Sequence, residues 1–148
     1  MKNYLLTAAA VLGLAVQPLM AETVEKTSTL NVEDAMDALE NAVTNAGATV
    51  FARVDHSQGA VSIEMELPDA QLLIFGNPMI GTPVMQQDLR AGLVLPLHVL
   101  IYNNNGETTI RFEDAGTLFE GLDVAPDAPF IERINGALNG LTNQATGG

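Results

Sequence analysis

The sequence predicts one small domain of the α+β class, in which helices pack on a β-sheet of about four strands. Apolar residues follow a helical period near both ends of the chain, and short apolar strands bounded by turn residues fill the region between them. The length agrees with a single domain, because the 127 residues after Ala21 suit one hydrophobic core and contain no internal repeat.

The first 21 residues have the layout of a secretory signal peptide. Lys2 precedes an apolar run from Tyr4 to Val16, and the small residue Ala21 stands at the expected cleavage site. The run is shorter than the roughly 20 residues of a membrane span. We therefore expect export to the periplasm, a mature chain that starts at Glu22, and no membrane span after the signal is removed.

The charge and the cysteine count exclude several classes of function. The sequence contains no Cys, which excludes a disulfide, a thiol nucleophile and a thiolate metal site. After residue 21, five Lys and Arg residues stand against eighteen Asp and Glu residues, a formal charge of −13. The positive residues form no basic stripe, so nucleic acid is excluded as a partner and anionic membrane surfaces are disfavoured. They are Lys26, Arg53, Arg90, Arg111 and Arg133.

The N-terminal third predicts a helix followed by a strand. Residues 22–30 are polar and unpatterned, which indicates a lead-in segment before the domain at residues 31–141. Asn31 is a helix cap, and the apolar stripe that follows ends before Gly47, a residue suited to a left-handed C-terminal cap. Thr49 to Asp55 alternates and is rich in β-formers, so we expect a strand there.

The segment Val61 to Leu67 fits two structures. Its apolar residues alternate with Ser and Glu, which favours a strand, whereas Ala60, Ile63 and Leu67 would share one side of a short helix. Period alone favours the strand.

The central part predicts further strands and one short helix. Gln71 to Phe75 is a buried strand that closes on the turn Gly76 to Pro78. Thr82 followed by Pro83 predicts a helix over residues 83–89. Strands over residues 93–102 and 107–112 should pair antiparallel, because the intervening run of Asn and Gly tolerates positive φ.

The C-terminal part predicts one more helix. Asp127 can cap a helix whose apolar stripe runs to Leu141, and the small polar residues 142–148 should form a flexible tail.

Four motifs carry a resemblance to a known family. They are TVFARVDH at residues 49–56, LLIFGNP at 72–78, GTPVM at 81–85 and LPLHVLIY at 95–102. In their order and separation the chain resembles the domain of unknown function 302 family over about residues 29–122. The resemblance implies an α+β domain with a mixed sheet and a helix after Asp55 and His56, and we adopt that helix over the strand. It implies no reaction, and His98 stands where the family more often has Lys or Arg.

The candidate site is a cleft between two strand exits. Loops beyond strand ends hold ligands on a rigid frame, and a Gly there lets the backbone approach closely. The imidazole of His56 can donate a hydrogen bond or offer a nitrogen to a metal. The alternative is that Asp55 only caps the following helix and His56 is a structural partner. The predicted ligand-binding residues are Asp55, His56, Phe75, Gly76, Asn77, Pro78 and Thr82.

The sequence gives weaker evidence for metal binding, nucleophilic catalysis and anion binding. His56 and His98 lie 42 residues apart without a metal-binding spacing, and Ser57 lies in no nucleophile motif. The loop from Gly76 to Thr82 could bind an anion at a helix N-terminus. We expect a noncatalytic periplasmic module that binds a small ligand or a partner protein, with no cofactor. The alternatives are a metal-handling protein or hydrolytic enzyme using His56 and His98, and a homodimer formed through sheet edges.

Overall fold

The computed structural model describes residues 22–148, so the expected signal peptide lies outside the described residues. Five strands form one sheet in the order β1-β5-β4-β3-β2, and every neighbouring pair is antiparallel. The α+β class is confirmed, but the sheet has a fifth strand and is antiparallel where a mixed sheet was expected. The strands are β1 (Thr23–Ser28), β2 (Thr49–Asp55), β3 (Ala70–Gly76), β4 (Leu97–Asn104) and β5 (Glu107–Glu113).

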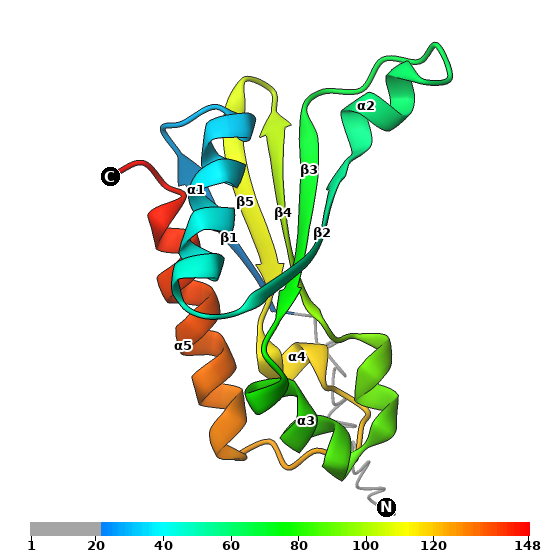
Figure 1. Ribbon diagram of the computed structural model, residues 1–148, viewed down its shortest axis with the longest axis vertical. Helices are drawn as coiled ribbons and strands as arrows, with labels where there is room; N and C mark the ends of the chain where they lie inside the picture. Colours follow the sequence, from blue (N-terminus) through cyan, green and yellow to red (C-terminus); the bar gives the residue numbers. More distant parts are fainter. Residues whose placement is uncertain (1–21) are drawn as a thin grey trace, which may run out of the picture.

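One face of the sheet is covered by α1 (Val32–Asn45) and α5 (Pro129–Gln144), which lie side by side (Figure 1). Alternate strand residues point into this layer, so that Leu73 and Phe75 are buried against the helices. The start of α1 is as predicted, because Asn31 Oδ1 accepts a hydrogen bond of 2.8 Å from Asp34 N–H. Gly47 follows the helix with φ +75°, which confirms its role.

The expected lead-in segment contains the edge strand β1. Its inward side carries Lys26, whose ammonium group donates to Asn139 O at 3.1 Å, Thr142 Oγ1 at 2.8 Å and Asn143 Oδ1 at 2.7 Å. Burial lowers the pKa of Lys26. The strand is attached to α5 by polar contacts, so it has no apolar alternation for a sequence reading to detect.

The flexible-tail prediction is wrong for residues 142–146. Thr142 and Ala145 are fully buried. Ser28 Oγ donates to Ala145 O at 2.6 Å, and Thr29 N–H donates to Thr146 O at 2.9 Å. These bonds fix the end of α5 against β1.

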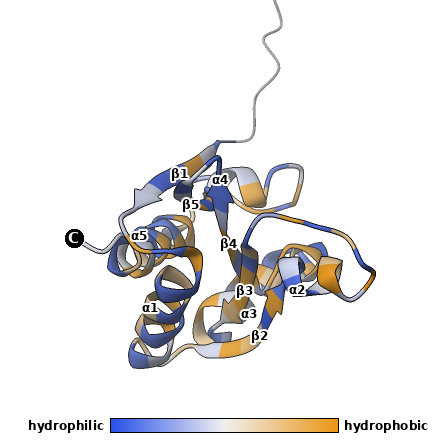
Figure 2. Ribbon diagram, turned by 90° about the horizontal axis from the view of Figure 1, so that it is seen from above, coloured by the Kyte–Doolittle hydropathy of each residue, from blue (hydrophilic) through white to orange (hydrophobic). Residues whose placement is uncertain are grey.

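The helix α2 (His56–Val61) projects beyond one end of the sheet (Figure 1). This confirms the helix implied by the family resemblance, but only for these residues. Residues 62–69 form a turn and an irregular loop, so the strand interpretation of 61–67 is wrong. Four apolar side chains of this segment are 47–66% exposed, and Figure 2 shows the apolar outer end of α2. They are Val61, Ile63, Met65 and Leu67.

At the other end of the sheet lie α3 (Pro78–Gln87), the 3₁₀ helix η1 (Leu89–Leu93) and α4 (Ala115–Leu118). The predicted helix start at Pro83 is wrong, because Asn77 is the cap and Pro78 occupies the first turn. The strand expected over residues 93–102 starts only at Leu97, since η1 and Pro96 precede it.

The start of α5 also differs from the prediction. The helix begins at Pro129 after Ala128, and Asp127 does not cap it. A proline at the first helical position is pre-organised for the helix, which explains a start without a side-chain cap.

Candidate functional site

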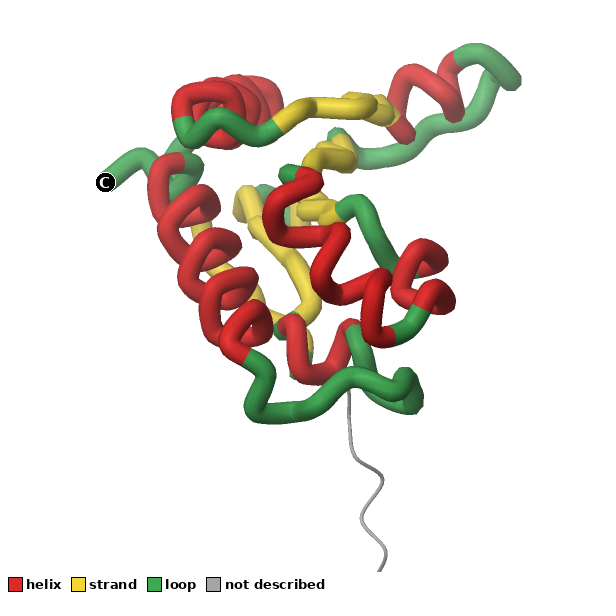
Figure 3. Tube along the Cα trace, turned by 60° about the horizontal axis from the view of Figure 1, so that its bottom comes forward, coloured by secondary structure: helices red, strands yellow, loops and turns green. Residues whose placement is uncertain are grey.

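A cavity of about 560 Å³ lies at the end of the sheet where β3 passes into α3. Figure 3 shows α3 and α5 on either side of this end of the molecule. The deep wall contains Phe75 and Ile134, which are 2% and 1% exposed, whereas Phe51 at the opening is 59% exposed. Among the lining residues of the described chain, only Asn77 and Thr82 carry polar side chains. The site is therefore an apolar cavity with a small polar patch.

Three segments meet at the cavity around Gly76. They are the end of β3, the residue before β4 and the bulged part of β2. A Cβ atom on Gly76 would lie 3.4 Å from Pro96 Cβ and 3.6 Å from Phe51 Cε2, which are ordinary van der Waals distances. The expectation that this position needs a Gly for close backbone approach therefore gains no support from the packing.

The N-terminus of α3 also borders the cavity, but its amide hydrogens are already bonded. Asn77 Oδ1 accepts from Met79 N–H at 2.9 Å, and Asn77 O accepts from the N–H groups of Ile80 and Gly81, both at 2.9 Å. Pro78 has no N–H to offer. The geometry therefore favours a tight connection at this loop over the anion site that the sequence left open, because the first turn has no free amide donor.

The structure separates the two halves of the predicted cleft. Because β2 and β3 are antiparallel, Thr49 faces Gly76 at one end of the pair, and Asp55 faces Gln71 toward the other. Asp55 and His56 therefore lie away from the cavity, and the prediction of one shared cleft is wrong. The other predicted residues, Phe75, Gly76, Asn77, Pro78 and Thr82, all line the cavity. That they bind a ligand stays a prediction.

The capping interpretation of Asp55 is confirmed. Its Oδ1 accepts a hydrogen bond from Ser57 Oγ and one of 2.9 Å from Gln58 N–H at the start of α2. The bond from Ser57, and then that from Gln58, lowers the pKa of Asp55. His56 is exposed beside it.

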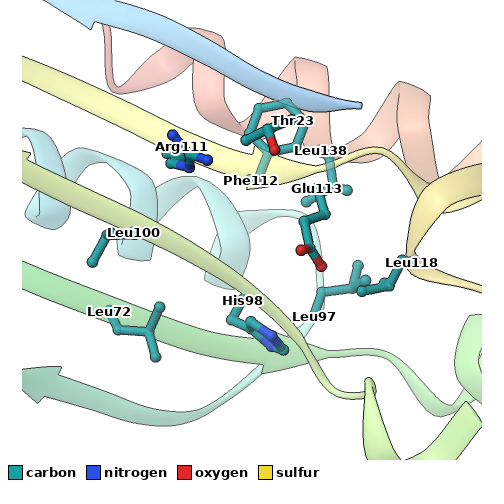
Figure 4. A pocket seen from close by; sticks show the side chains of 10 residues that line it. All are labelled: Thr23, Leu72, Leu97, His98, Leu100, Arg111, Phe112, Glu113, Leu118 and Leu138. Atoms are coloured by element: carbon teal, nitrogen blue, oxygen red, sulfur yellow. The ribbon is translucent and has the colours of Figure 1, made fainter. Parts of the chain in front are cut away.

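His98 lies in a different place, beside a smaller pocket of about 210 Å³ (Figure 4). The paired register of β4 and β5 ends at Leu100 and Arg111, so the strands diverge where His98 and Glu113 line this pocket. The His98 ring is tied to its own strand, with Nδ1 3.0 Å from Pro96 O.

The two histidines do not share a site. In the sheet register, His98 faces Ile74 on β3 whereas Asp55 faces Gln71. Asp55 ends β2, which is separated from β4 by β3, and His56 begins α2 directly after it. Strand spacing therefore places the two histidines on the order of 15 Å apart. Residues 22–148 contain no group of three or more His, Asp or Glu side chains placed to hold a metal ion. The geometry therefore gives no support to joint chemistry by His56 and His98.

A carboxylate holds the wall that α3 and η1 form. Asp88 accepts hydrogen bonds from Arg90 Nη2 at 2.6 Å, from Arg90 N–H at 2.9 Å and from Asp123 N–H at 2.9 Å. It is 9% exposed and links η1 to the loop before α5. The hydrogen bonds from Arg90, and then that from Asp123, hold the pKa of Asp88 far below its ordinary value.

We predict that Asp88→Asn destabilises the protein near neutral pH and much less in acid. The folded-state pKa of Asp88 lies below its unfolded value of about 4, so its contribution is complete above pH ~4 and is lost progressively as the pH falls below that. Melting temperatures of both proteins between pH 2 and 7 measure the difference. A difference that stays constant down to pH 2 would contradict the ionised hydrogen-bonded carboxylate.

Sequence reasoning missed much of the cavity wall. Ala137 and Leu141 of α5 were assigned to the helix's apolar stripe, and Phe51 to an ordinary strand. No motif marks them, because the space arises where small residues from distant segments meet. These small residues include Ala46, Ala48, Gly81, Gly92 and Ala137.

The fold and the cavity define a small α+β domain with a ligand-sized, mostly apolar cavity. The chain belongs to the family described as domain of unknown function DUF302, whose profile matches residues 24–141. A crystal structure of an uncharacterized conserved DUF302 protein from Bacillus stearothermophilus has a TM-score of 0.75 and 16% identity, over 83% of this chain and 97% of the other. That likeness establishes the fold.

Two curated relatives of the chain are named as fluoride-specific ion channels. Fluoride-specific ion channel FluC 1 of Brucella suis biovar 1 (strain 1330) is 31% identical over 109 residues, which are 72% of this chain and 43% of that protein. FluC 1 of Brucella abortus biovar 1 (strain 9-941) is also 31% identical over 109 residues, or 40% of its length. The chain thus spans less than half of these relatives. No helix within residues 22–148 is long and apolar enough to cross a membrane.

Proposed function

We propose that this domain is a noncatalytic module that binds a small molecule in the cavity bounded by Phe75 to Pro78. The volume of about 560 Å³ carries the proposal, since ligand sites usually measure ~300–1,000 Å³ and are mostly apolar with a few polar groups. The opening beside the exposed Phe51 gives access from solvent. The lining offers neither a nucleophile with its base nor an acid and base pair, which supports binding over catalysis.

Fluoride does not suit this cavity. A small, strongly hydrated anion needs N–H donors or cations to replace its water. The described lining contains no Lys, Arg or His, and the first turn of α3 has no free backbone N–H, so the side chains of Asn77 and Thr82 are the donors that remain. The name of the relatives therefore does not supply the ligand of the cavity, and we propose an organic molecule.

We also propose that the domain acts in the periplasm. The proposal rests on the order of Lys2, the apolar run Tyr4 to Val16 and Ala21 in the sequence. An acidic surface suits solubility there. Mass spectrometry of the protein recovered from the periplasmic fraction tests it, with an N-terminus at Glu22 as the expected result.

Binding of the neutral fluorescent probe N-phenyl-1-naphthylamine tests the ligand-binding proposal. We predict that the described domain raises the fluorescence of the probe in a saturable way and that Ala137→Phe abolishes the rise, because the new ring occupies the cavity. Sodium fluoride should not displace the probe.

Gly136→Phe is the matched control for this experiment. It adds the same ring at the neighbouring position of α5, where Gly136 is exposed and an added Cβ meets nothing within 4 Å. Gly136→Phe should bind the probe like the wild type. Equal binding by wild type and Ala137→Phe would refute the use of this cavity.

Self-association is a second candidate role, and the exposed arm formed by α2 and residues 62–69 favours it. The arm presents apolar side chains, and none of the residues of α2 is buried. The open face of the sheet carries the half-buried Leu72, Leu100 and Tyr102. The arm of one copy therefore matches the sheet face of another in apolar character.

The predicted pairing through sheet edges has less support. The edge strand β2 contains a bulge between Val50 and Ala52, and the residues after β1 bond to the end of α5. We predict a dimer in light scattering that Ile63→Glu converts to a monomer, because the substitution places a charge in the apolar arm. A monomeric wild type at high micromolar concentration would contradict this role.

A further inference from the structure

We propose that the ligand of the cavity is an uncharged, mainly apolar molecule that carries one hydrogen-bonding group, placed beside Thr82. The assignment rests on the proposed function, namely that the cavity binds a small molecule. It adds the chemical class of that molecule and the residue that recognises its polar group.

The absence of charge follows from the lining. Among the described residues that line the cavity, none is Asp, Glu, Lys, Arg or His. A charged group moved from water into such surroundings loses its hydration without gaining a counter-charge, and this penalty is several kcal/mol. A neutral molecule avoids this penalty.

Anions are disfavoured for two further reasons. The N-terminus of α3, which would otherwise attract an anion, has its Met79, Ile80 and Gly81 amides bonded to Asn77. The formal charge of −13 on residues 22–148 also lowers the local concentration of anions around the protein.

Cations gain from the negative charge of the chain but not from the cavity. The rings of Phe51 and Phe75 are the aromatic groups in its wall, and a cation over such a ring gains about 0.5–2 kcal/mol. No carboxylate lines the wall to add to this gain. In the buried part of the cavity, against Phe75, the desolvation penalty therefore exceeds the attraction.

The polar patch is small and has unused hydrogen-bonding groups. Asn77 Oδ1 caps α3, but Asn77 Nδ2 has no hydrogen-bond partner among residues 22–148, and neither has the Thr82 hydroxyl. Both side chains line the same cavity, where Thr82 is exposed and Asn77 is half-buried, so these groups are open to solvent in the absence of a ligand. A hydroxyl or carbonyl oxygen of the ligand would accept from them while its apolar part occupies the space against Phe75 and Ile134.

Competition among three compounds with the same ten-carbon tail tests the charge. The wild-type domain, saturated with N-phenyl-1-naphthylamine, is titrated at pH 7.5 with 1-decanol, decanoate or decyltrimethylammonium, each kept below its micelle concentration. We expect 1-decanol to displace half of the probe at a concentration at least about tenfold below that of either ion, which corresponds to ~1.4 kcal/mol. Equal or better displacement by either ion overturns the assignment.

Substitutions at Thr82 test the polar contact. Thr82→Val keeps the shape and removes the hydroxyl, and we expect the 1-decanol concentration at half-displacement to rise roughly fivefold, as for the loss of one hydrogen bond. Thr82→Ser retains the hydroxyl and should behave like the wild type, and the probe itself should bind all three proteins equally. An unchanged Thr82→Val overturns the role of Thr82.

The experiments distinguish a failure of the ligand assignment from a failure of the proposed function. If the probe binds and Ala137→Phe blocks it, but decanoate or decyltrimethylammonium competes as well as 1-decanol, the cavity is a binding site for a charged ligand and only the present assignment is wrong. If neither the probe nor 1-decanol binds, and 1-decanol leaves the melting temperature unchanged, the proposed function is wrong as well.

Discussion

Phe75→Ala is expected to lower the free energy of unfolding by about 3–5 kcal/mol, the usual cost of removing a buried aromatic side chain. Phe75 is 2% exposed and belongs to the core between the sheet and the helices, and it is also the deep wall of the cavity. The substitution removes core contacts and enlarges an existing space that the neighbouring residues cannot close. Urea denaturation at pH 7, followed by circular dichroism, measures the loss.

Phe51→Ala is the matched control, because it removes the same ring from the opening of the same cavity. Phe51 is 59% exposed, so we expect a loss of stability below about 1 kcal/mol and weaker binding of N-phenyl-1-naphthylamine. Together the two variants distinguish the part of the cavity wall that stabilises the fold from the part that is open to solvent. Similar losses of stability in both would mean that Phe75 is not held in the core as described.

The difference between these two rings also illustrates what the sequence could predict. The strand Gln71 to Phe75 and its Gly turn were evident from the apolar run and its abrupt end. Five of the predicted ligand-binding residues, from Phe75 to Thr82, do line one cavity. They lie close together in the sequence, so local patterns were sufficient to group them.

The remaining site predictions depended on which strand ends meet, and that is a property of the sheet order. Asp55 and His56 were grouped with the turn because both follow strands, yet antiparallel neighbours place successive exits at opposite ends. The strand β1 was missed for a related reason. Its Lys26 faces inward to hold α5, a contact between residues more than one hundred positions apart.

Polar contacts also surround Arg53, a basic residue of β2 that joins α1 to the sheet. Its Nη1 donates to Asp37 Oδ1 at 2.6 Å and Glu40 Oε2 at 3.2 Å, and its Nε donates to Gln71 Oε1 at 2.7 Å. Its Nη2 lies 3.0 Å from Glu33 Oε1 as an ion pair without hydrogen-bond geometry. Burial lowers the pKa of Arg53, but the bonds to Asp37 and Glu40 outweigh burial and raise it.

Removing the guanidinium group should therefore be the second most damaging change. We predict that Arg53→Met lowers the free energy of unfolding by about 2–3 kcal/mol, because Gln71, which is 5% exposed, loses its donor and three carboxylates lose their shared cation. The repulsion among the carboxylates is screened by salt, so the penalty should shrink when NaCl is raised to about 1 M.

The matched control for Arg53→Met is Arg111→Met. Arg111 pairs only with Glu25 among the described residues, and both side chains are about half exposed. An exposed pair of this kind contributes about 0–1 kcal/mol, so Arg111→Met should be nearly silent. Urea titrations of both variants at low and high salt measure the loss in free energy of unfolding. If the loss in Arg53→Met is the same at both salt concentrations, the guanidinium stabilises the fold by packing and hydrogen bonding and does not relieve repulsion among the carboxylates of α1.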